Sequence, residues 1–271
     1  MDIYFENKIN LLERAKYNNQ YPDDDKNHFH NEHELYYLAQ GHVKYFIDNK
    51  IYDLQSGDMV FIPKGIFHRT SYESVKSAER LLISFDDEYI GEDYLEYIYE
   101  LWKNHHIRIQ YKYIDEFNDL LRKIEYEHNN KENGYQKMEK LYLRQLLIFI
   151  SRHRLNEIPD KTSEIHKLIQ DAANYVSQNS SADLSLTTIA KKYNVSTGYF
   201  SKSFKNVTGM RFSEYINITR ITAASKLLET TNMSITDISA ECGFDDSNYF
   251  AAVFKKYKGV TPKKYAVQFK K

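Results

Sequence analysis

The sequence is poor in cysteine and in long apolar runs, and each shortage excludes a class of protein. Cys242 is the single cysteine among 271 residues, which excludes an internal disulfide framework. No apolar run approaches the roughly 18 residues that a membrane-spanning helix needs. The amino-terminal stretch MDIYFENKINLLERAKYNN lacks the basic start and apolar segment of a secretory signal. We therefore expect a cytoplasmic globular protein with no membrane partner.

The net charge of −1 conceals two parts of opposite sign. Residues 1–165 hold 22 Lys and Arg against 30 Asp and Glu, a net charge of −8. Residues 166–271 hold 15 against 8, a net charge of +7. Nucleic acid attracts a basic segment and repels an acidic one. Any nucleic-acid function is therefore expected in the carboxy-terminal part.

The basic part contains one structural unit twice. Residues 185–209 read SLTTIAKKYNVSTGYFSKSFKNVTG, and residues 234–259 read SITDISAECGFDDSNYFAAVFKKYKG. In each copy a serine caps a short helix, a tight turn follows, and a second helix with an apolar inner side ends at a glycine. This arrangement is typical of the helix-turn-helix motif, and its duplication in a basic segment favours DNA binding over a purely structural hairpin.

The second helix of the second copy is expected to bury one side. Its apolar residues fall on one side of a 3.6-residue turn, so we expect all five to be buried: Tyr249, Phe250, Val253, Phe254 and Tyr257. Between the copies, residues 212–228 contain neither proline nor glycine, which predicts a continuous connecting helix. This connecting helix would fix the distance between the second helices of the two copies, which we call the reading helices. They could then enter successive major grooves, about one helical turn of DNA apart.

This part of the chain resembles the carboxy-terminal signature of AraC/XylS-type transcription regulators over most of residues 168–268. The matching positions are Arg220, Ala224, Leu227, Leu228, Ser234, Ile235, Ile238, Gly243, Phe244, Tyr249, Phe250, Phe254, Lys255, Lys256, Gly259, Thr261, Pro262 and Tyr265. The resemblance implies two helix-turn-helix units joined by a long helix, and sequence-specific binding to double-stranded promoter or operator DNA. RNA polymerase is a further candidate partner.

The outward sides of the two second helices are the expected DNA contacts. They comprise Thr197, Ser201, Lys202 and Lys205 in the first unit and Ser247, Asn248, Ala251 and Lys255 in the second. The family commonly has arginine where this chain has Ala252, so the second unit is expected to read DNA weakly. Asn248 can still pair with adenine and Lys255 can reach a phosphate. Ala251 and Ala252 can pack against thymine methyl groups, or they are only helix-forming residues on a solvated side. The two alanines also raise a further alternative, a binding module whose DNA unit has lost its specificity.

Residues 28–72 predict a small antiparallel barrel or sandwich, because strand-like blocks alternate with turn signals. Over about residues 20–86 the spacing resembles both cupin motifs, and in metal-binding cupins the matching residues ligate a divalent ion. Those residues are His28, His30, Glu34 and His68. His33 and His42 fall outside this pattern and are expected at the surface.

Two functions for the barrel follow from this resemblance. In the first, the barrel binds a polar small-molecule effector without any cofactor, and a sugar is the first candidate on family resemblance alone. The effector contacts would be His30, Glu34, Tyr36 and His68. In the second, a metal-dependent cupin enzyme is fused to a DNA-binding tail. The attached DNA-binding unit favours the first.

From Asp93 to Arg154 the apolar spacing becomes helical, with one stripe over residues 114–124 and another over residues 138–149. The resemblance implies that this region forms a homodimer, and the second stripe is expected to be the seam. Residues 156–163, NEIPDKTS, contain a proline among polar residues and indicate a connector.

The sequence therefore predicts an α+β multidomain chain. Residues 1–91 form a cupin-like effector-sensing domain, residues 92–155 a helical dimerisation region, residues 156–166 a linker, and residues 167–271 an all-α double helix-turn-helix domain. The predicted function is that of a one-component transcription regulator, an activator rather than an enzyme.

Overall fold

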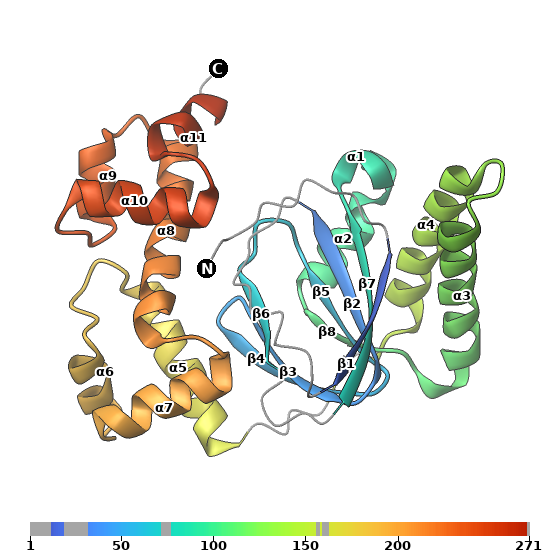
Figure 1. Cartoon of the computed structure of the whole chain (residues 1–271), viewed down its shortest axis with the longest axis horizontal. Coiled ribbons are helices and arrows are strands. Elements are labelled where there is room, and N and C mark those ends of the chain that lie inside the picture. Colours follow the sequence, from blue (N-terminus) through green and yellow to red (C-terminus); the bar gives the residue numbers. More distant parts are fainter. Residues whose placement is uncertain (1–11, 19–31, 72–76, 156–157, 159–162, 270–271) are drawn as a thin grey trace.

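The computed structural model of this chain describes residues 12–18, 32–71, 77–155, 158 and 163–269. They form successive layers: the helices α3 and α4, a five-stranded sheet, a three-stranded sheet, and a separate group of helices from α5 to α11 (Figure 1). Among these residues, no helix has the length and apolar character that a membrane crossing requires. The predicted α+β organisation, sheet-rich in front and helical behind, is confirmed.

The strands of the described residues pair into two antiparallel sheets. They are β1 (Glu13–Asn18), β2 (His33–Gln40), β3 (His42–Ile47), β4 (Lys50–Gln55), β5 (Asp58–Ile62), β6 (His68–Ser71), β7 (Ser77–Phe85) and β8 (His106–Arg108). The first sheet has the order β1-β7-β2-β5-β8 and the second the order β4-β3-β6. Alternate residues of each strand point into the space between the sheets, where Tyr36, Val43, Tyr45 and Val60 belong to one buried cluster.

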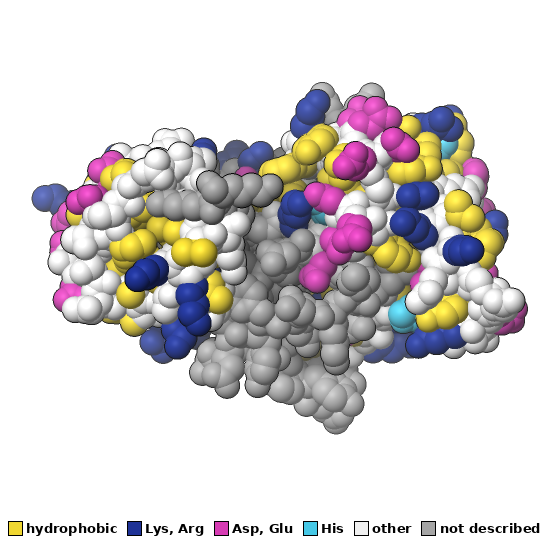
Figure 2. Space-filling view, turned by 90° about the horizontal axis from the view of Figure 1, so that it is seen from above, with side chains coloured by type: hydrophobic (Ala, Val, Ile, Leu, Met, Phe, Trp, Pro, Cys, Tyr) yellow, Lys and Arg dark blue, Asp and Glu magenta, His cyan; other side chains and the backbone are white. Residues whose placement is uncertain are grey.

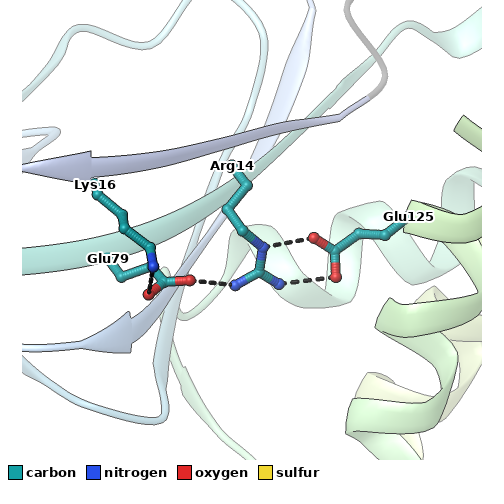
Figure 3. Close-up of polar contacts among 4 residues, drawn as sticks. All are labelled: Arg14, Lys16, Glu79 and Glu125. Carbon is teal, nitrogen blue, oxygen red and sulfur yellow. Dashed lines mark hydrogen bonds and ion pairs between the residues drawn. The ribbon is translucent and has the colours of Figure 1, made fainter. Parts of the chain in front are cut away.

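The other side of the first sheet is covered by helices. These are α1 (Asp87–Ile90), α2 (Leu95–Trp102), α3 (Ile114–Asn130) and α4 (Tyr135–His153), with 3-10 turns η1 (Glu92–Tyr94) and η2 (Tyr111–Tyr113). Leu35 and Phe61 of the sheet share a buried cluster with Phe117 of α3 and Leu146 of α4. Arg14 of β1 ties α3 to the sheet, because its guanidinium lies 2.6 Å from Glu125 and 2.7 Å from Glu79 (Figure 3).

The stripe expected as a dimer seam is divided between the interior and the surface. Leu146 and Phe149 are buried against α3 and the sheet, whereas Leu141 is 54% exposed. Dimerisation through this stripe stays a prediction. The expectation that residues 92–155 are purely helical is wrong, because Ile107 of β8 pairs with Met59 and is buried.

The carboxy-terminal helices follow the predicted repeat. They are α5 (Glu164–Gln178), α6 (Leu186–Lys192), α7 (Thr197–Thr208), α8 (Phe212–Thr230), α9 (Ile235–Glu241), α10 (Ser247–Lys258) and α11 (Pro262–Phe269). The expected continuous connecting helix is α8, and the predicted glycine ends are confirmed by positive φ angles of 75° at Gly209 and 72° at Gly259. Helix α5 begins at Glu164, inside the predicted linker, because Ser163 caps it by accepting a hydrogen bond from the His166 N–H.

Candidate DNA interface and effector pocket

The first helix-turn-helix unit presents a polar outer side on α7. Helix α7 begins after Ser196, whose Oγ accepts a hydrogen bond from the Tyr199 N–H at 3.2 Å. Phe200 and Phe204 point inward and are fully buried. The predicted contacts lie on the opposite side, where Thr197, Lys202 and Lys205 are exposed and Ser201 is half-buried. The structure brings these four side chains to one accessible side of the helix.

The second unit repeats this arrangement on α10, with one correction. Phe250, Val253, Phe254 and Tyr257 are buried as expected, but Tyr249 is 54% exposed. Its ring lies against Phe244 with the centroids 6.1 Å apart, and its hydroxyl accepts a hydrogen bond from Asn217 at 3.2 Å. Tyr199, at the matching position of α7, is 53% exposed. Both tyrosines therefore belong to the surface beside the reading helices rather than to the core.

The predicted contacts of the second unit also lie on the outer side of their helix. Asn248 and Lys255 are exposed, Ser247 and Ala251 are half-buried, and the neighbouring Ala252 is exposed. Helix α10 follows two acidic residues and is capped by the second of them, Asp246, whose Oδ1 accepts a hydrogen bond from the Tyr249 N–H at 2.6 Å. On the face of the molecule in Figure 2, acidic side chains form a band on the lobe that contains the sheets, among some lysine and arginine side chains, and further lysine and arginine side chains project from the other lobe.

The two units touch each other directly, which the sequence did not predict. Arg220 of α8 donates from Nε to Ser180 O at 2.9 Å and from Nη2 to Ala182 O at 3.3 Å, and its guanidinium lies over the Phe244 ring. It thus joins the loop before α6 to the turn before α10. A Cβ added to Gly243 in that turn would lie 2.8 Å from Ser180 O. This contact and α8 together hold the spacing of the two reading helices.

Three of the four predicted effector residues lie together between the two sheets; the fourth, His30, lies outside the described residues. Glu34, Tyr36 and His68 are buried, and Oε2 of Glu34 lies 3.7 Å from Nε2 of His68. The structure adds Tyr45, whose hydroxyl donates to Oε1 of Glu34 at 3.2 Å and whose ring meets Tyr36 edge to face. Burial, with the nearby Glu34 carboxylate, raises the pKa of Tyr45 well above its ordinary value, so its hydroxyl stays a donor. The alternation of Val43, Tyr45 and Ile47 could have indicated this residue.

The predicted metal set is only half described. His28 and His30 lie outside the described residues, whereas Glu34 and His68 lie close together between the two sheets. Among the described residues, no group of three or more His, Cys, Asp or Glu side chains is arranged to hold a metal ion. Metal binding by these four residues therefore stays a prediction, as does effector binding by His30, Glu34, Tyr36 and His68.

One of the two histidines expected at the surface is buried. His33 is 3% exposed, because α1 covers this end of β2. Its Nδ1 accepts from the Lys64 N–H at 3.3 Å, so Nε2 carries the proton that it donates to Asp87 at 2.7 Å. His42 is at the surface as predicted, and its Nε2 lies 2.6 Å from Asp53.

A partly buried ion pair connects β8 to the neighbouring strand of the first sheet. The fully buried Asp58 accepts hydrogen bonds from Arg108 Nε at 2.6 Å, from Arg108 Nη2 at 2.9 Å and from the Gln55 N–H at 3.0 Å. His106 Nε2 lies 3.2 Å from the same carboxylate. Burial would raise the pKa of Asp58, but the hydrogen bonds from His106 and Arg108 outweigh it, so this pKa lies below its ordinary value. The network borders a polar cavity of about 550 Å³ that reaches Gln170 of α5.

Comparison with known proteins identifies both domains. Residues 13–99 match the AraC-like ligand binding domain, and residues 189–268 match the helix-turn-helix domain. The HTH-type transcriptional activator RhaR of Mannheimia succiniciproducens is 24% identical over 258 residues, covering 95% of this chain and 91% of that protein. RhaR of Escherichia coli O139:H28 is 25% identical, covering 91% and 89%.

Among solved structures, the C-terminal domain of the two-component response regulator yesN from Fusobacterium nucleatum is 36% identical to this chain. The match covers 38% of this chain and 99% of that domain, with a TM-score of 0.35. ToxT from Vibrio cholerae is 15% identical, with 96% of this chain and 98% of that chain covered and a TM-score of 0.40.

Proposed function

Because the chain belongs to the AraC family, with an AraC-like ligand binding domain ahead of its helix-turn-helix domain, we propose that it is a transcriptional activator that binds promoter DNA under the control of a small molecule. The observation that carries the proposal is the duplicated reading unit. Helices α7 and α10 have twelve residues each, begin after a capping side chain and end at a glycine. Both present polar outer sides on a basic domain.

The barrel is the proposed effector site. Glu34, Tyr45 and His68 offer hydrogen-bonding groups, and the Tyr36 ring offers an apolar surface, a combination that suits the hydroxyls and C–H faces of a sugar. We propose that the barrel binds this molecule without transforming it, that the protein acts in the cytoplasm as a homodimer, and that bound protein contacts RNA polymerase.

Selection of genomic fragments by the full chain tests the DNA part of this proposal. We expect a few fragments to be enriched, and their affinity to exceed that of random duplex by at least about a thousandfold at physiological salt. Affinity for both should fall as salt rises, since lysine–phosphate contacts release counterions. Equal affinity for selected and random duplexes, even in dilute salt, would contradict a sequence-specific function.

The first unit is expected to supply most of the specificity. Lys202→Ala removes the basic side chain at the centre of the exposed side of α7 and should raise the Kd for a selected fragment roughly five- to tenfold or more. Asn248→Ala in α10 should have a smaller effect. Lys137→Ala, which removes an exposed lysine from α4, is the control for charge alone. A fluorescence titration in which Asn248→Ala is the more damaging change would reverse this assignment.

A further inference from the structure

We propose that the second sheet of the sensor couples the effector pocket to the first helix-turn-helix unit, with Arg69 and Asn49 as the positioning residues at the contact. The proposal deepens the proposed function and rests on it, since it names how a ligand in the barrel would reach one of the two reading helices.

The proposed effector residues and the first helix-turn-helix unit lie on opposite sides of the second sheet, which is a single layer of strands. On β3, Tyr45 points into the barrel and its neighbour Phe46 points the other way. On β6, His68 faces Glu34 between the two sheets, whereas Arg69 faces the helical domain. Because successive residues of a strand point to opposite sides, Tyr45 and His68 are each the sequence neighbour of an interface residue, Phe46 and Arg69 respectively.

The apolar half of this interface continues into α7. Phe46, with Phe67 before β6, shares a buried cluster with residues of α5, α7 and α8. The Phe46 ring meets Tyr215 of α8 edge to face with centroids 5.7 Å apart, and the Tyr215 ring lies 5.4 Å from that of Phe204 of α7. Three aromatic rings in contact therefore lead from the sheet to the inner side of the first reading helix.

The polar half consists of two contacts. The Tyr215 hydroxyl is placed to donate to Oδ1 of Asn49, in the β3–β4 turn, with Ala173 O also within 3.0 Å. Arg69 reaches the end of α7, where a Cβ on Gly209 would lie 2.5 Å from its Nε. The last carbonyl groups of a helix carry partial negative charge, so a guanidinium at this end stabilises it.

The sensor docks without covering the outer side of α7. Strands β3 and β6 pack against α7 and strand β4 against α5, and in Figure 1 the helices α9 to α11 lie above α5 to α7 in the same lobe. Thr197, Lys202 and Lys205 remain exposed in this docked arrangement. The contact therefore acts by holding the first unit in position rather than by blocking DNA, and the coupling must work in both directions.

Hydrogen–deuterium exchange on the full chain tests this proposal, because the repeat supplies an internal control. The Gly209 N–H bonds to Lys205 O at 2.7 Å, and the matching Gly259 N–H bonds to Lys255 O at 2.9 Å. Arg69→Ala should speed exchange in the peptide around Gly209 roughly two- to fivefold and leave the peptide around Gly259 unchanged. Lys16→Ala, which removes an exposed lysine from the first sheet, should change neither.

The pocket variant His68→Gln is the decisive arm, and it should change exchange at Gly209 but not at Gly259. Unchanged exchange at Gly209 in either variant, or equal change at the two glycines, would overturn the proposal. If Arg69→Ala fails to fold, Asn49→Gly replaces it, because glycine keeps the positive φ of 65° and removes only the side-chain acceptor. Hydrogen exchange is measured without DNA, so its result does not depend on the proposed function. Failure of the proposed function would be seen in a separate binding experiment, in which the wild-type chain shows no preference among duplexes.

Discussion

Asp58→Ala is expected to lower the free energy of unfolding of the sensor domain by about 3 to 5 kcal/mol. The variant leaves the half-buried guanidinium of Arg108 without the carboxylate that accepts its two hydrogen bonds, and it leaves the Gln55 N–H without its acceptor. It also removes the side-chain contact between β8 and β5. Urea denaturation at neutral pH, followed by far-ultraviolet circular dichroism, measures the loss. Asp53→Ala, which breaks an exposed pair with His42, should cost less than about 1 kcal/mol.

The contribution of Asp58 should also depend on pH in a defined direction. Its pKa is lower in the folded chain than in the unfolded one, so the unfolded state binds the proton more tightly. The stabilisation is complete above the unfolded pKa of about 4 and is lost as pH falls through the folded pKa. The difference between wild type and Asp58→Asn should therefore shrink below about pH 4. A difference that grows on acidification would refute the assignment.

Gly243→Ala is the second large effect, with an expected loss of about 2 to 5 kcal/mol in the helix-turn-helix domain and a corresponding loss of DNA affinity. The backbone at Gly243 has a φ of 82°, which costs an L-residue about 1 to 2 kcal/mol. In addition, the new methyl group would lie 2.8 Å from Ser180 O and 2.9 Å from Ser181 Cα, both backbone atoms that cannot rotate away. The two units would have to move apart.

Two other variants separate these causes. Gly134→Ala has a comparable φ of 88° but nothing within 4 Å of the new Cβ, so it reports the backbone strain alone. Gly243→Asn reports mainly the clash, because asparagine tolerates positive φ, as Asn194 does at the matching turn of the first unit. If Gly243→Ala and Gly134→Ala lose equal stability in urea titrations, the contact between the units contributes nothing.

Local signals in the sequence were enough to predict the helix-turn-helix domain. Serine caps, glycine ends and a repeated apolar spacing act within a few residues, and the structure has helices where they predicted them. The same holds for α8, whose residues include neither proline nor glycine. The prediction that Tyr249 is buried was wrong because periodicity shows only which side of a helix a residue lies on. It does not show whether a neighbouring helix extends far enough to cover the first turn of α10.

The errors in the front half come from contacts between distant segments. Tyr45, Phe46 and Ile47 are consecutive buried residues. Such a run indicates that both sides of the strand are covered, but the sequence does not show which segment covers each side. Here one cover is the barrel interior and the other is a domain more than a hundred residues away. His33 was likewise misjudged because its cover, α1, follows it by some fifty residues.

The two proposed reading helices begin differently. Helix α7 follows Ser196, whereas α10 follows Asp245 and Asp246, whose carboxylates repel phosphate groups. In the proposed DNA complex, one protomer therefore has a strongly binding end and a weakly binding end, and the footprint of that protomer lacks a dyad. Inverting its target would reverse the orientation of the bound protomer on the DNA.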